Sequence, residues 1–254
     1  MPVKGNIVEI FSGIQGEGTH VGERQIFLRL AGCNRKCDYC DQPEARTIPL
    51  EAMIEIAPGG REFMALPNPL RTETVARAIR MLNDERLHRA LAVTGGEPLL
   101  QAGFLGALLP DVRRTGLPVL LETNGTRPDD LAPLLPHVNI VSMDLKLKSA
   151  TGRPMPVRLH ERFLRTAAAA DVEMIVKAVV VKTTTLREIR RAAKLVASAA
   201  QDAPLVLQPV TPVLKRGGAR PPSPQIVLRL QDAAAAVLRD VRVIPQTHKM
   251  TGQR

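Results

Sequence analysis

Three cysteines lie within eight residues of one another, and the chain has no others: Cys33, Cys37 and Cys40, in the stretch CNRKCDYCDQ. Their close spacing indicates a metal centre, and an odd count argues against a framework of disulfides. Two kinds of centre are open at this point. A structural zinc ion needs four protein ligands, and His20 upstream would supply the fourth. A 4Fe-4S cluster held by three thiolates leaves one iron free for a small chelating ligand.

Polar and glycine-rich motifs follow almost every apolar run of the chain. TGGEPLL, ETNGT, SMDLK, QPVTP and QTHK each come directly after such a run. In parallel β/α folds, ligand sites are built at the carboxyl ends of the strands. Turns alone explain the glycines and prolines, but they do not explain charged residues such as Glu97, Asp144 and Lys146. The motifs therefore predict one large site to which most strand ends contribute.

The apolar runs alternate with amphipathic stretches, as strands alternate with helices in α/β proteins. This order predicts a parallel sheet with right-handed crossovers, either open or rolled up. The fold class is α/β, in the form of an incomplete (β/α) barrel of about six parallel strands. The expected strands are residues 26–31, 90–95, 118–123, 139–144, 174–181, 204–210 and 241–246, and residues 7–11 could pair at an edge of the sheet.

Helices are expected between these strands, each with one apolar face. Thr185 and Glu188 have the spacing of a capping box, and Ser223 followed by Pro224 is typical of a helix start. The expected buried residues are Val75, Ile79 and Leu82 in the first helix, Ile189, Ala193 and Val196 in the second, and Ile226, Leu230, Ala233 and Val237 in the third.

Two segments interrupt the alternation. Residues 43–71 form an insertion punctuated by proline and glycine, and residues 211–224 have the composition of a mobile, basic loop. Neither is long enough to be a domain, and no internal repeat is apparent. We therefore expect one domain spanning residues 1–254.

The composition is that of an ordinary globular protein, with 44% hydrophobic and 24% charged residues. No apolar run is long enough to span a bilayer, and the first residues lack the pattern of a signal peptide. We therefore expect a cytoplasmic protein with no membrane partner. The net charge of +10 is compatible with nucleic-acid binding, but six aromatic residues are few for base stacking and the basic residues are scattered. A basic surface suited to an anionic substrate is the simpler interpretation.

The cysteine motif resembles the signature of radical S-adenosylmethionine (SAM) enzymes, which have an aromatic residue before the last cysteine, here Tyr39. The GGEP stretch, Gly95 to Pro98, is similar to the family motif that meets the methionine ammonium group. The resemblance implies a 4Fe-4S cluster whose open iron binds SAM. It also implies that reductive cleavage of SAM yields a 5'-deoxyadenosyl radical that takes a hydrogen atom from the substrate.

A narrower resemblance covers about residues 9–249. IQGEG, FLRLAGCN, CDYCD, TGGEP, ETNGT, QPVTP and QTHK together resemble the 7-carboxy-7-deazaguanine synthase family of radical SAM lyases. The resemblance implies conversion of 6-carboxy-5,6,7,8-tetrahydropterin to 7-carboxy-7-deazaguanine, with ring contraction and loss of ammonia, in queuosine and 7-deazapurine biosynthesis. It also implies that the radical is regenerated, so that the cofactor is reused.

Site residues follow from the same resemblance, position by position. Gln15 and Glu17 could read the donor and acceptor edge of the pterin, and Arg29 could bind its carboxylate through two nitrogens. The implied substrate contacts are Ile14, Gln15, Gly16, Glu17, Arg29, Thr94 and His248. The implied cofactor contacts are Tyr39, Gly95, Gly96, Glu97, Glu122, Asn124, Ser142, Met143, Asp144, Lys146, Gln208, Pro209, Val210 and Thr211.

Structural roles are the alternative for several of these residues. Arg29 lies in an apolar strand and could be half of a core ion pair, and His248 outside its motif would be an ordinary surface histidine. Glu122 and Asp144 could orient lysines or backbone groups, and Gln15 could hold a turn.

One position departs from the family pattern. In the family, the residue two positions after the last cysteine of the motif is usually a threonine or serine whose hydroxyl binds Mg²⁺. In this chain that residue is Gln42. An amide oxygen can bind a hard cation, but the longer side chain must be accommodated differently. Magnesium is therefore an expected cofactor only if Gln42 can replace the hydroxyl.

The resemblance also implies a flavodoxin or ferredoxin as electron donor, and a homodimer. Two other functions remain open from sequence. A glycyl-radical-enzyme activase would share the cysteine motif, GGEP and the Asp-x-Lys strand end, but it leaves IQGEG and QTHK unexplained. A zinc protein with three cysteines and one histidine as ligands could bind nucleic acid through its basic surface.

Overall fold

The computed structural model describes residues 2–212 and 219–253. Within them, ten strands form one sheet in the order β12-β11-β10-β9-β8-β7-β3-β2-β4-β5, and β1 pairs with β6 beside it. The strands are β1 (Lys4–Gly5), β2 (Ile7–Ile14), β3 (Arg24–Leu30), β4 (Glu51–Glu55), β5 (Phe63–Pro67), β6 (Leu70–Arg71), β7 (Leu91–Gly95), β8 (Val119–Thr123), β9 (Ile140–Asp144), β10 (Glu173–Val180), β11 (Leu205–Pro209) and β12 (Val241–Val243).

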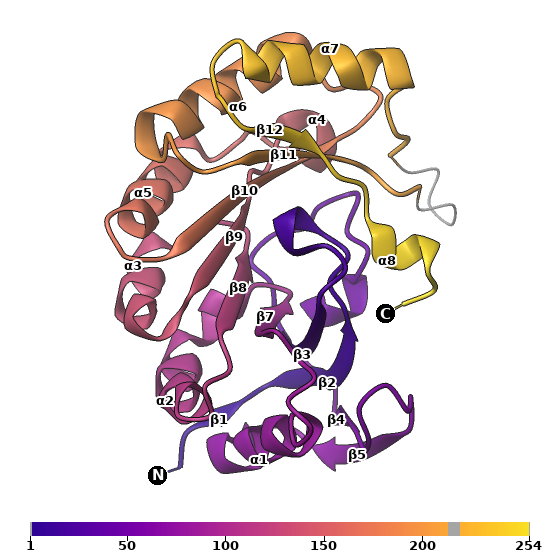
Figure 1. Cartoon of the computed structure of the whole chain (residues 1–254), viewed down its shortest axis with the longest axis vertical. Helices are drawn as coiled ribbons and strands as arrows, with labels where there is room; N and C mark the ends of the chain where they lie inside the picture. The colour runs from indigo at the N-terminus through magenta and orange to yellow at the C-terminus, as the bar shows by residue number, and fades with distance from the viewer. Residues whose placement is uncertain (1, 213–218, 254) are drawn as a thin grey trace.

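In the part of the sheet that runs from β3 to β7 and on to β12, each strand is parallel to the next. They form a curved sheet, and helices follow its outer side (Figure 1). Among the described residues no strand pairing joins β12 to β5, so the barrel is not closed. The predicted incomplete barrel is confirmed, as are the strands expected from residue 26 to residue 210.

Helices alternate with these strands because their sequences have one apolar face each. The predicted buried faces of α1 and α6 are confirmed. In α7, Leu230 and Ala233 are buried as predicted, while Ile226 is only partly buried and Val237, also partly buried, lies beyond the end of the helix. The helices are α1 (Thr72–Leu82), α2 (Ala102–Arg113), α3 (Pro128–Leu131), α4 (Lys148–Thr151), α5 (Val157–Ala168), α6 (Leu186–Ala199), α7 (Pro224–Ala235) and α8 (Thr247–Met250), with 3₁₀ turns η1 (Gly18–His20), η2 (Pro43–Arg46), η3 (Pro98–Gln101) and η4 (Ala132–His137).

The helix caps agree with prediction in part. Ser223 caps α7 and Thr185 accepts a hydrogen bond from the backbone N–H of Glu188 at 3.2 Å. The second half of the expected capping box is absent from the described contacts, because the Glu188 carboxylate accepts from the Ser149 N–H at 3.0 Å instead. Glu188 therefore ties α6 to α4.

The N-terminal strand and the insertion differ most from expectation. Residues 7–11 were expected at an edge, but β2 lies inside the sheet, antiparallel to β3 and parallel to β4. The insertion 43–71 supplies β4 and β5 as an antiparallel hairpin, which covers β2. Only β4 alternates exposed and buried residues, and it does so over too few positions to stand out in a proline-rich segment; β5 has no buried residue.

Two further expectations concern the C-terminal third. The strand expected over 241–246 ends at Val243, and residues 244–246 lead toward α8. The predicted mobile loop 211–224 falls partly on residues 213–218, which lie outside the described residues. In the part of the chain that is described, no helix combines the length and apolar character needed to cross a membrane.

Candidate active site

A cavity opens at the carboxyl ends of the parallel strands, where the motifs were expected to meet. The ends of β7, β8, β9 and β11 reach it, together with the cysteine loop, the turn after β2 and α8. The predicted site residues that line it are Ile14, Gln15, Gly16, Glu17, Arg29, Cys33, Cys37, Tyr39, Cys40, Gln42, Thr94, Gly95, Gly96, Glu122, Asn124, Ser142, Asp144, Lys146, Gln208, Val210 and His248.

Four predicted cofactor contacts lie outside the lining: Glu97, Met143, Pro209 and Thr211. Met143 is fully buried and Pro209 and Thr211 are half-buried. Met143 lies between Ser142 and Asp144 in β9, and because successive side chains of a strand point to opposite faces, its side chain points away from the cavity that its two neighbours line. A motif read as a continuous stretch therefore overstates the number of contacting side chains.

Glu97 was expected to offer a counter-charge to the cofactor, and the structure gives its side chain another role. The carboxylate is fully buried and accepts hydrogen bonds from Thr123 Oγ1 at 2.8 Å, the Asn124 N–H at 2.8 Å and the Leu99 N–H at 3.1 Å. Burial raises its pKa, against these donors. Glu97 therefore fixes the end of β7 to the end of β8.

The two glycines of GGEP allow the end of β7 to pack directly on the cysteine loop. A Cβ on Gly96 would lie 2.1 Å from the Gly32 carbonyl oxygen, next to Cys33. A Cβ on Gly95 would lie 2.1 Å from the Leu30 oxygen, and the φ of Gly95 is +135°. Only glycine fits both conditions, so these residues set the position of the loop that carries the cysteines.

The three cysteines are free thiols, partly exposed at the cavity. Burial raises the pKa of Cys33 and Cys37, so their conversion to thiolates requires a cationic partner such as a metal centre. Both ring nitrogens of His20 contact other groups, Glu23 and Glu173, each at 3.0 Å. His20 does not line the cavity, so it is not placed as a fourth zinc ligand.

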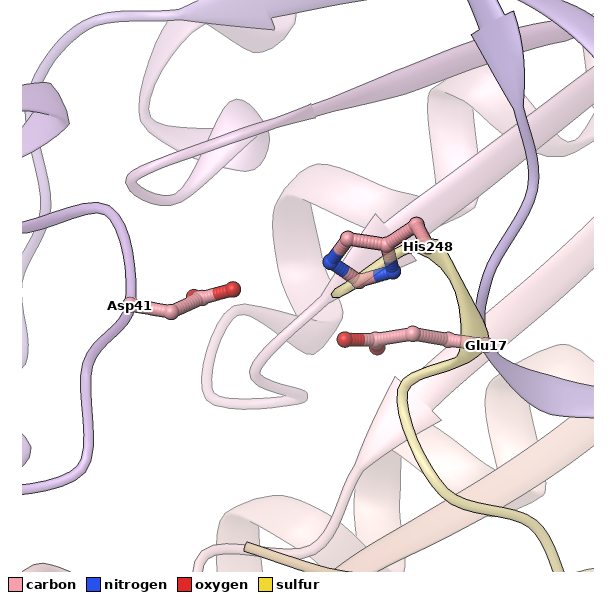
Figure 2. A group of neighbouring side chains, drawn as sticks. All are labelled: Glu17, Asp41 and His248. Carbon is pink, nitrogen blue, oxygen red and sulfur yellow. The ribbon is translucent and has the colours of Figure 1, made fainter. Parts of the chain in front are cut away.

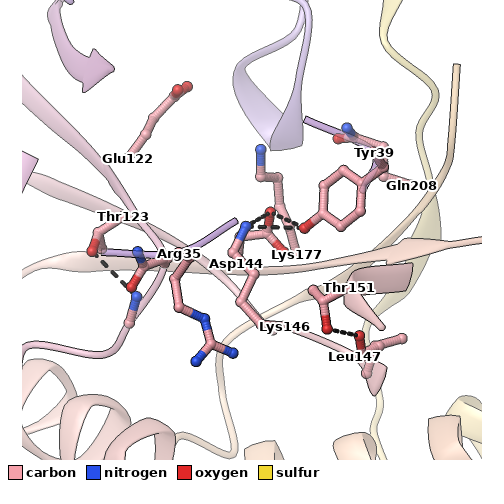
Figure 3. Close-up of polar contacts among 12 residues, drawn as sticks. Arg35, Tyr39, Glu122, Thr123, Asp144, Lys146, Leu147, Thr151, Lys177 and Gln208 are labelled. Atoms are coloured by element: carbon pink, nitrogen blue, oxygen red, sulfur yellow. Dashed lines mark hydrogen bonds and ion pairs between the residues drawn. The ribbon is translucent and has the colours of Figure 1, made fainter. Parts of the chain in front are cut away.

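Lys146, Asp144 and Tyr39 form a buried polar cluster beside the cysteines (Figure 3). Lys146 Nζ lies 2.7 Å from Asp144 Oδ2 and 2.9 Å from the Tyr39 hydroxyl. Burial is the largest single effect and would lower the pKa of Lys146, but Asp144, Tyr39 and Cys37 together outweigh it and raise that pKa well above the usual value. Asp144 therefore orients Lys146, which is the structural role considered for it as an alternative. Its second oxygen, Oδ1, has no hydrogen-bond partner among the described residues.

Two acceptors on the cavity wall have no hydrogen-bond partner among the described residues: Asp144 Oδ1 and Gln208 Oε1. A buried acceptor without a partner costs about 1–3 kcal/mol. A ligand with hydroxyl or amino donors would satisfy both atoms. The ribose hydroxyls and amino groups of SAM are donors of this kind, so the cavity wall fits the expected cofactor.

Gln15 is held at the far wall by its own side chain. Its amide nitrogen donates to Glu122 Oε1 at 3.0 Å and to Gln25 Oε1 at 3.2 Å, and its Oε1 accepts from the Glu17 N–H at 3.0 Å. Thr94 donates to the other oxygen of Glu122 at 2.8 Å. Gln15 thus holds the turn before Glu17, and Glu122 orients both Gln15 and Thr94.

Glu17 is the best-partnered acid of the cavity. Its carboxylate pairs with Lys177 and accepts from the amide of Gln246 at 2.7 Å and of Gln208 at 3.3 Å. Burial would raise its pKa, but Lys177 above all lowers the pKa of Glu17 to about 2. Glu17 is therefore ionised at neutral pH.

Arg29 combines the two roles considered for it. Its Nε donates to Glu9 Oε1 at 2.8 Å in a buried ion pair, and its guanidinium lies over the Phe11 ring. The side chain also lines the cavity. A guanidinium has five N–H donors, so the ion pair with Glu9 leaves donors for an anionic ligand.

His248 is buried rather than on the surface, with 8% exposure, and packs directly against Gly16. A Cβ at position 16 would lie 2.0 Å from His248 Nδ1. The Thr247 N–H donates to the Gly16 oxygen at 3.0 Å, which fixes α8 to this turn. Burial lowers the pKa of His248, so its imidazole is neutral at pH 7.

Gly16→Ala should therefore displace His248 and impair turnover without removing the metal centre. Overpacking costs about 1–3 kcal/mol, or about 5- to 150-fold in kcat/KM if it falls on the bound substrate. Steady-state kinetics and iron content of the variant measure the two effects. Gly103→Ala is the control, because a Cβ there meets nothing within 4 Å. Equal kinetics of the two variants would contradict this role of Gly16.

Sequence reasoning missed several lining residues: Phe27, Arg35, Asp41, Thr123, Lys177, Val179 and Gln246. Lys177 carried a signal, since it is a lone charge inside the apolar strand MIVKAVVV. Asp41 and Gln246 stood within quoted motifs, CDYCD and QTHK, without a role. Arg35 carried no signal in sequence, and its Nη2 is buried without a partner among the described residues.

The chain matches the model of the radical SAM superfamily over residues 28–196. It is 40% identical to the 7-carboxy-7-deazaguanine synthase of Geobacter sulfurreducens over 96% of both chains. It is 36% identical to the 7-carboxy-7-deazaguanine synthase of Methanopyrus kandleri, over 96% of this chain and 92% of that protein.

Solved structures agree on the fold. QueE from Escherichia coli superposes with a TM-score of 0.61 at 22% identity, over 96% of this chain and 95% of that one. A radical SAM methyltransferase from Sphaerobacter thermophilus superposes with a TM-score of 0.63 at 13% identity, over 88% of this chain and 66% of that one.

Proposed function

The chain belongs to the radical SAM superfamily and, within it, to the 7-carboxy-7-deazaguanine synthase family, and from this we propose that it converts 6-carboxy-5,6,7,8-tetrahydropterin to 7-carboxy-7-deazaguanine. The reaction contracts a ring and releases ammonia, as a lyase of queuosine and 7-deazapurine biosynthesis. The observation that carries the proposal is the 40% identity to a curated 7-carboxy-7-deazaguanine synthase over 96% of the chain.

Cys33, Cys37 and Cys40 would hold a 4Fe-4S cluster. The cluster and SAM together would supply a 5'-deoxyadenosyl radical. Asp144 Oδ1 and Gln208 Oε1 would accept hydrogen bonds from the cofactor. The glycines of GGEP allow the backbone at the end of β7 to lie close to the cysteine loop. Glu97 holds this backbone in place through its hydrogen bond from the Asn124 N–H. These assignments rest on the positions of the side chains around one cavity.

The substrate side would be built from other residues that line the same cavity. Glu17 is an ionised acceptor suited to the paired donors of a pterin edge, and Gln15 is oriented beside it by Glu122. Arg29 would bind the pterin carboxylate with the donors that Glu9 does not use. His248, neutral and buried, would pack on the ring.

Arg29→Ala should weaken substrate use while the cluster's spectrum stays intact. Removing a buried charged hydrogen-bond partner costs at least about 2 kcal/mol, which corresponds to about a 30-fold rise in KM. Kinetics as a function of pterin concentration, alongside the thermal midpoint, check this. If the midpoint falls and KM is unchanged, Arg29 acts only through its ion pair with Glu9.

Further features of the function are proposed with it. Gln42 lines the cavity and would offer its amide oxygen to Mg²⁺ if the reaction uses that ion. The electron donor would be an acidic carrier such as a flavodoxin or ferredoxin, which a net charge of +10 attracts. The active form would be a homodimer in the cytoplasm, where free thiols persist.

An assay with less SAM than substrate tests the reaction type. The product and ammonia together contain the atoms of the substrate, so no net redox change occurs and the cofactor can be regenerated. We expect several molecules of product per molecule of SAM. An activase of glycyl-radical enzymes would consume SAM without making a deazaguanine. Consumption of one molecule of SAM for each molecule of product would contradict the proposed reuse of the cofactor.

A further inference from the structure

The cysteine loop, residues 31–42, is described throughout, and it contains no helix or strand. Its position therefore depends on contacts of individual groups. At the C-terminal end of the loop, the amide of Gln246 donates to Asp41 Oδ2 at 3.1 Å. The Asp41 side chain there points toward those of Glu17 and His248 (Figure 2). These contacts anchor the end of the loop that follows the last cysteine.

A closed ring of hydrogen bonds holds the other end of the loop, next to the first cysteine. Asn34 Nδ2 donates to Thr126 Oγ1 at 2.9 Å, and the Thr126 hydroxyl donates to Asn124 Oδ1 at 2.5 Å. Asn124 Nδ2 donates back to Asn34 Oδ1 at 2.9 Å, which closes the ring. All three bonds run in the same direction, so each polarises the next and strengthens it. The ring joins the cysteine loop to the segment that follows β8.

Asn124 and Thr126 can hold Asn34 in place because they are themselves fixed. Both are buried, and the Thr126 N–H donates to Asn124 Oδ1 at 3.1 Å. The Asn124 N–H donates to Glu97, and its carbonyl oxygen accepts from Nε2 of the buried His160 at 3.1 Å. Asn34 itself is exposed. The ring therefore ties an exposed loop residue to a buried and fully bonded part of the fold.

The residue after Asn34 makes a hydrogen bond to the first cysteine. The Arg35 N–H donates to Cys33 Sγ at 3.4 Å. The peptide group that carries this N–H joins Asn34 to Arg35, so holding the Asn34 side chain restricts the direction in which the N–H points. Hydrogen bonds to the sulfur ligands of an iron–sulfur cluster are among the factors that set its reduction potential.

We propose that Asn34 is a positioning residue of the cluster, which keeps the Arg35 N–H directed at Cys33 Sγ. This bond slows the loss of iron and raises the reduction potential, because the reduced cluster carries more negative charge for an N–H donor to stabilise. Asn124 and Thr126, two polar residues of ETNGT, act on the cluster through Asn34. The role rests on the proposed function only in that it requires the 4Fe-4S cluster.

Two variants open the ring at different points: Asn34→Ala in the loop, and Thr126→Val, which leaves every residue of the loop in place. Both are reconstituted anaerobically and measured without SAM or pterin. We expect transfer of iron to a chelator to be about tenfold faster than in wild type. A redox titration followed by electron paramagnetic resonance should give a more negative midpoint potential for both. The double variant should match Asn34→Ala, because the ring can be broken only once.

Lys36→Ala and Thr166→Val are the matched controls and should behave like wild type. Lys36 is exposed in the same loop, and the Thr166 hydroxyl donates to the Arg162 carbonyl oxygen within α5. The role of Asn34 is refuted if Asn34→Ala and Thr126→Val release iron and titrate like these controls. It is also refuted if their thermal midpoints fall while iron release and potential stay unchanged, since that is the result of a purely structural contact.

Iron content separates this result from the proposed function. A wild type that takes up no iron would overturn both. A wild type with about four irons per chain, whose ring variants match the controls, would refute the role of Asn34 alone. If Asn34→Ala takes up no iron, the release rate and potential of Thr126→Val decide between the two results.

Discussion

Replacing Cys37 by alanine is expected to abolish cluster assembly and all cleavage of SAM. The motif provides three thiolates for a cube of four irons, and the chain has no other cysteine that could substitute. Iron should fall from about four per chain to background. The visible spectrum, the iron and sulfide content and the yield of 5'-deoxyadenosine measure this directly.

Lys36→Ala is the matched control for this loss. Lys36 is exposed in the same loop and supplies no thiol, so its variant should keep the cluster and its chemistry. A Cys37→Ala protein that still cleaves SAM would show that the cluster has been assigned to the wrong residues.

Replacing Lys177 by methionine is expected to cause the largest loss of stability in the cavity wall. Lys177 neutralises Glu17, and the Lys177 side chain is buried in the wall while that of Glu17 is mostly buried. Breaking a buried ion pair by removing one partner costs about 3–5 kcal/mol. For a chain of this size, 3 kcal/mol lowers the thermal midpoint by about 6–12 °C. Thermal unfolding of the anaerobic holoenzyme measures the shift.

Two comparisons make this prediction specific. Lys182→Met makes the same change at an exposed lysine just beyond β10 and should leave the midpoint unchanged. The double variant Glu17→Gln with Lys177→Met removes the stranded charge and should recover most of the loss. Equal midpoints for Lys177→Met and the double variant would contradict the ion-pair explanation.

The same pair predicts a pH dependence with a definite sign. Glu17 has its pKa lowered from 4.5 to about 2 in the folded protein. Its contribution to stability is therefore fully present above pH 4.5 and is lost as the pH falls from about 4.5 to about 2. In Lys177→Met burial raises the pKa of the stranded Glu17, so the difference between wild type and variant should be largest at pH 7 and should narrow as the pH falls and Glu17 of the variant is protonated.

The sheet could be predicted from sequence because its central strands are buried on both faces and therefore appear as continuous apolar runs. β4 and β5 could not, because each is only five residues long in a segment rich in proline, and β5 has no buried residue that would give it a pattern. The order of the strands placed the polar motifs at one edge, which is why most of the candidate site was predicted. Partners across the cavity are a tertiary property, and no local pattern joins Gln246 to Asp41.

Glu97 is the motif residue whose contacts in the structure differ most from the role that the motif suggested. Its place in GGEP suggested a contact with the cofactor, yet its carboxylate points into the protein and holds Thr123 and the Asn124 backbone. For Lys177 the sequence was informative without naming a motif. An isolated lysine in an apolar strand predicts that a buried partner exists, although the sequence does not show which residue it is. Glu17 is that partner, 160 residues away in sequence.

The most direct test of the function is an anaerobic incubation of the reconstituted protein with a reductant, SAM and 6-carboxy-5,6,7,8-tetrahydropterin, with the products identified by mass spectrometry. We predict 7-carboxy-7-deazaguanine and an equal amount of ammonia, both absent when SAM is omitted. Cleavage of SAM to 5'-deoxyadenosine with the pterin left intact would contradict the account.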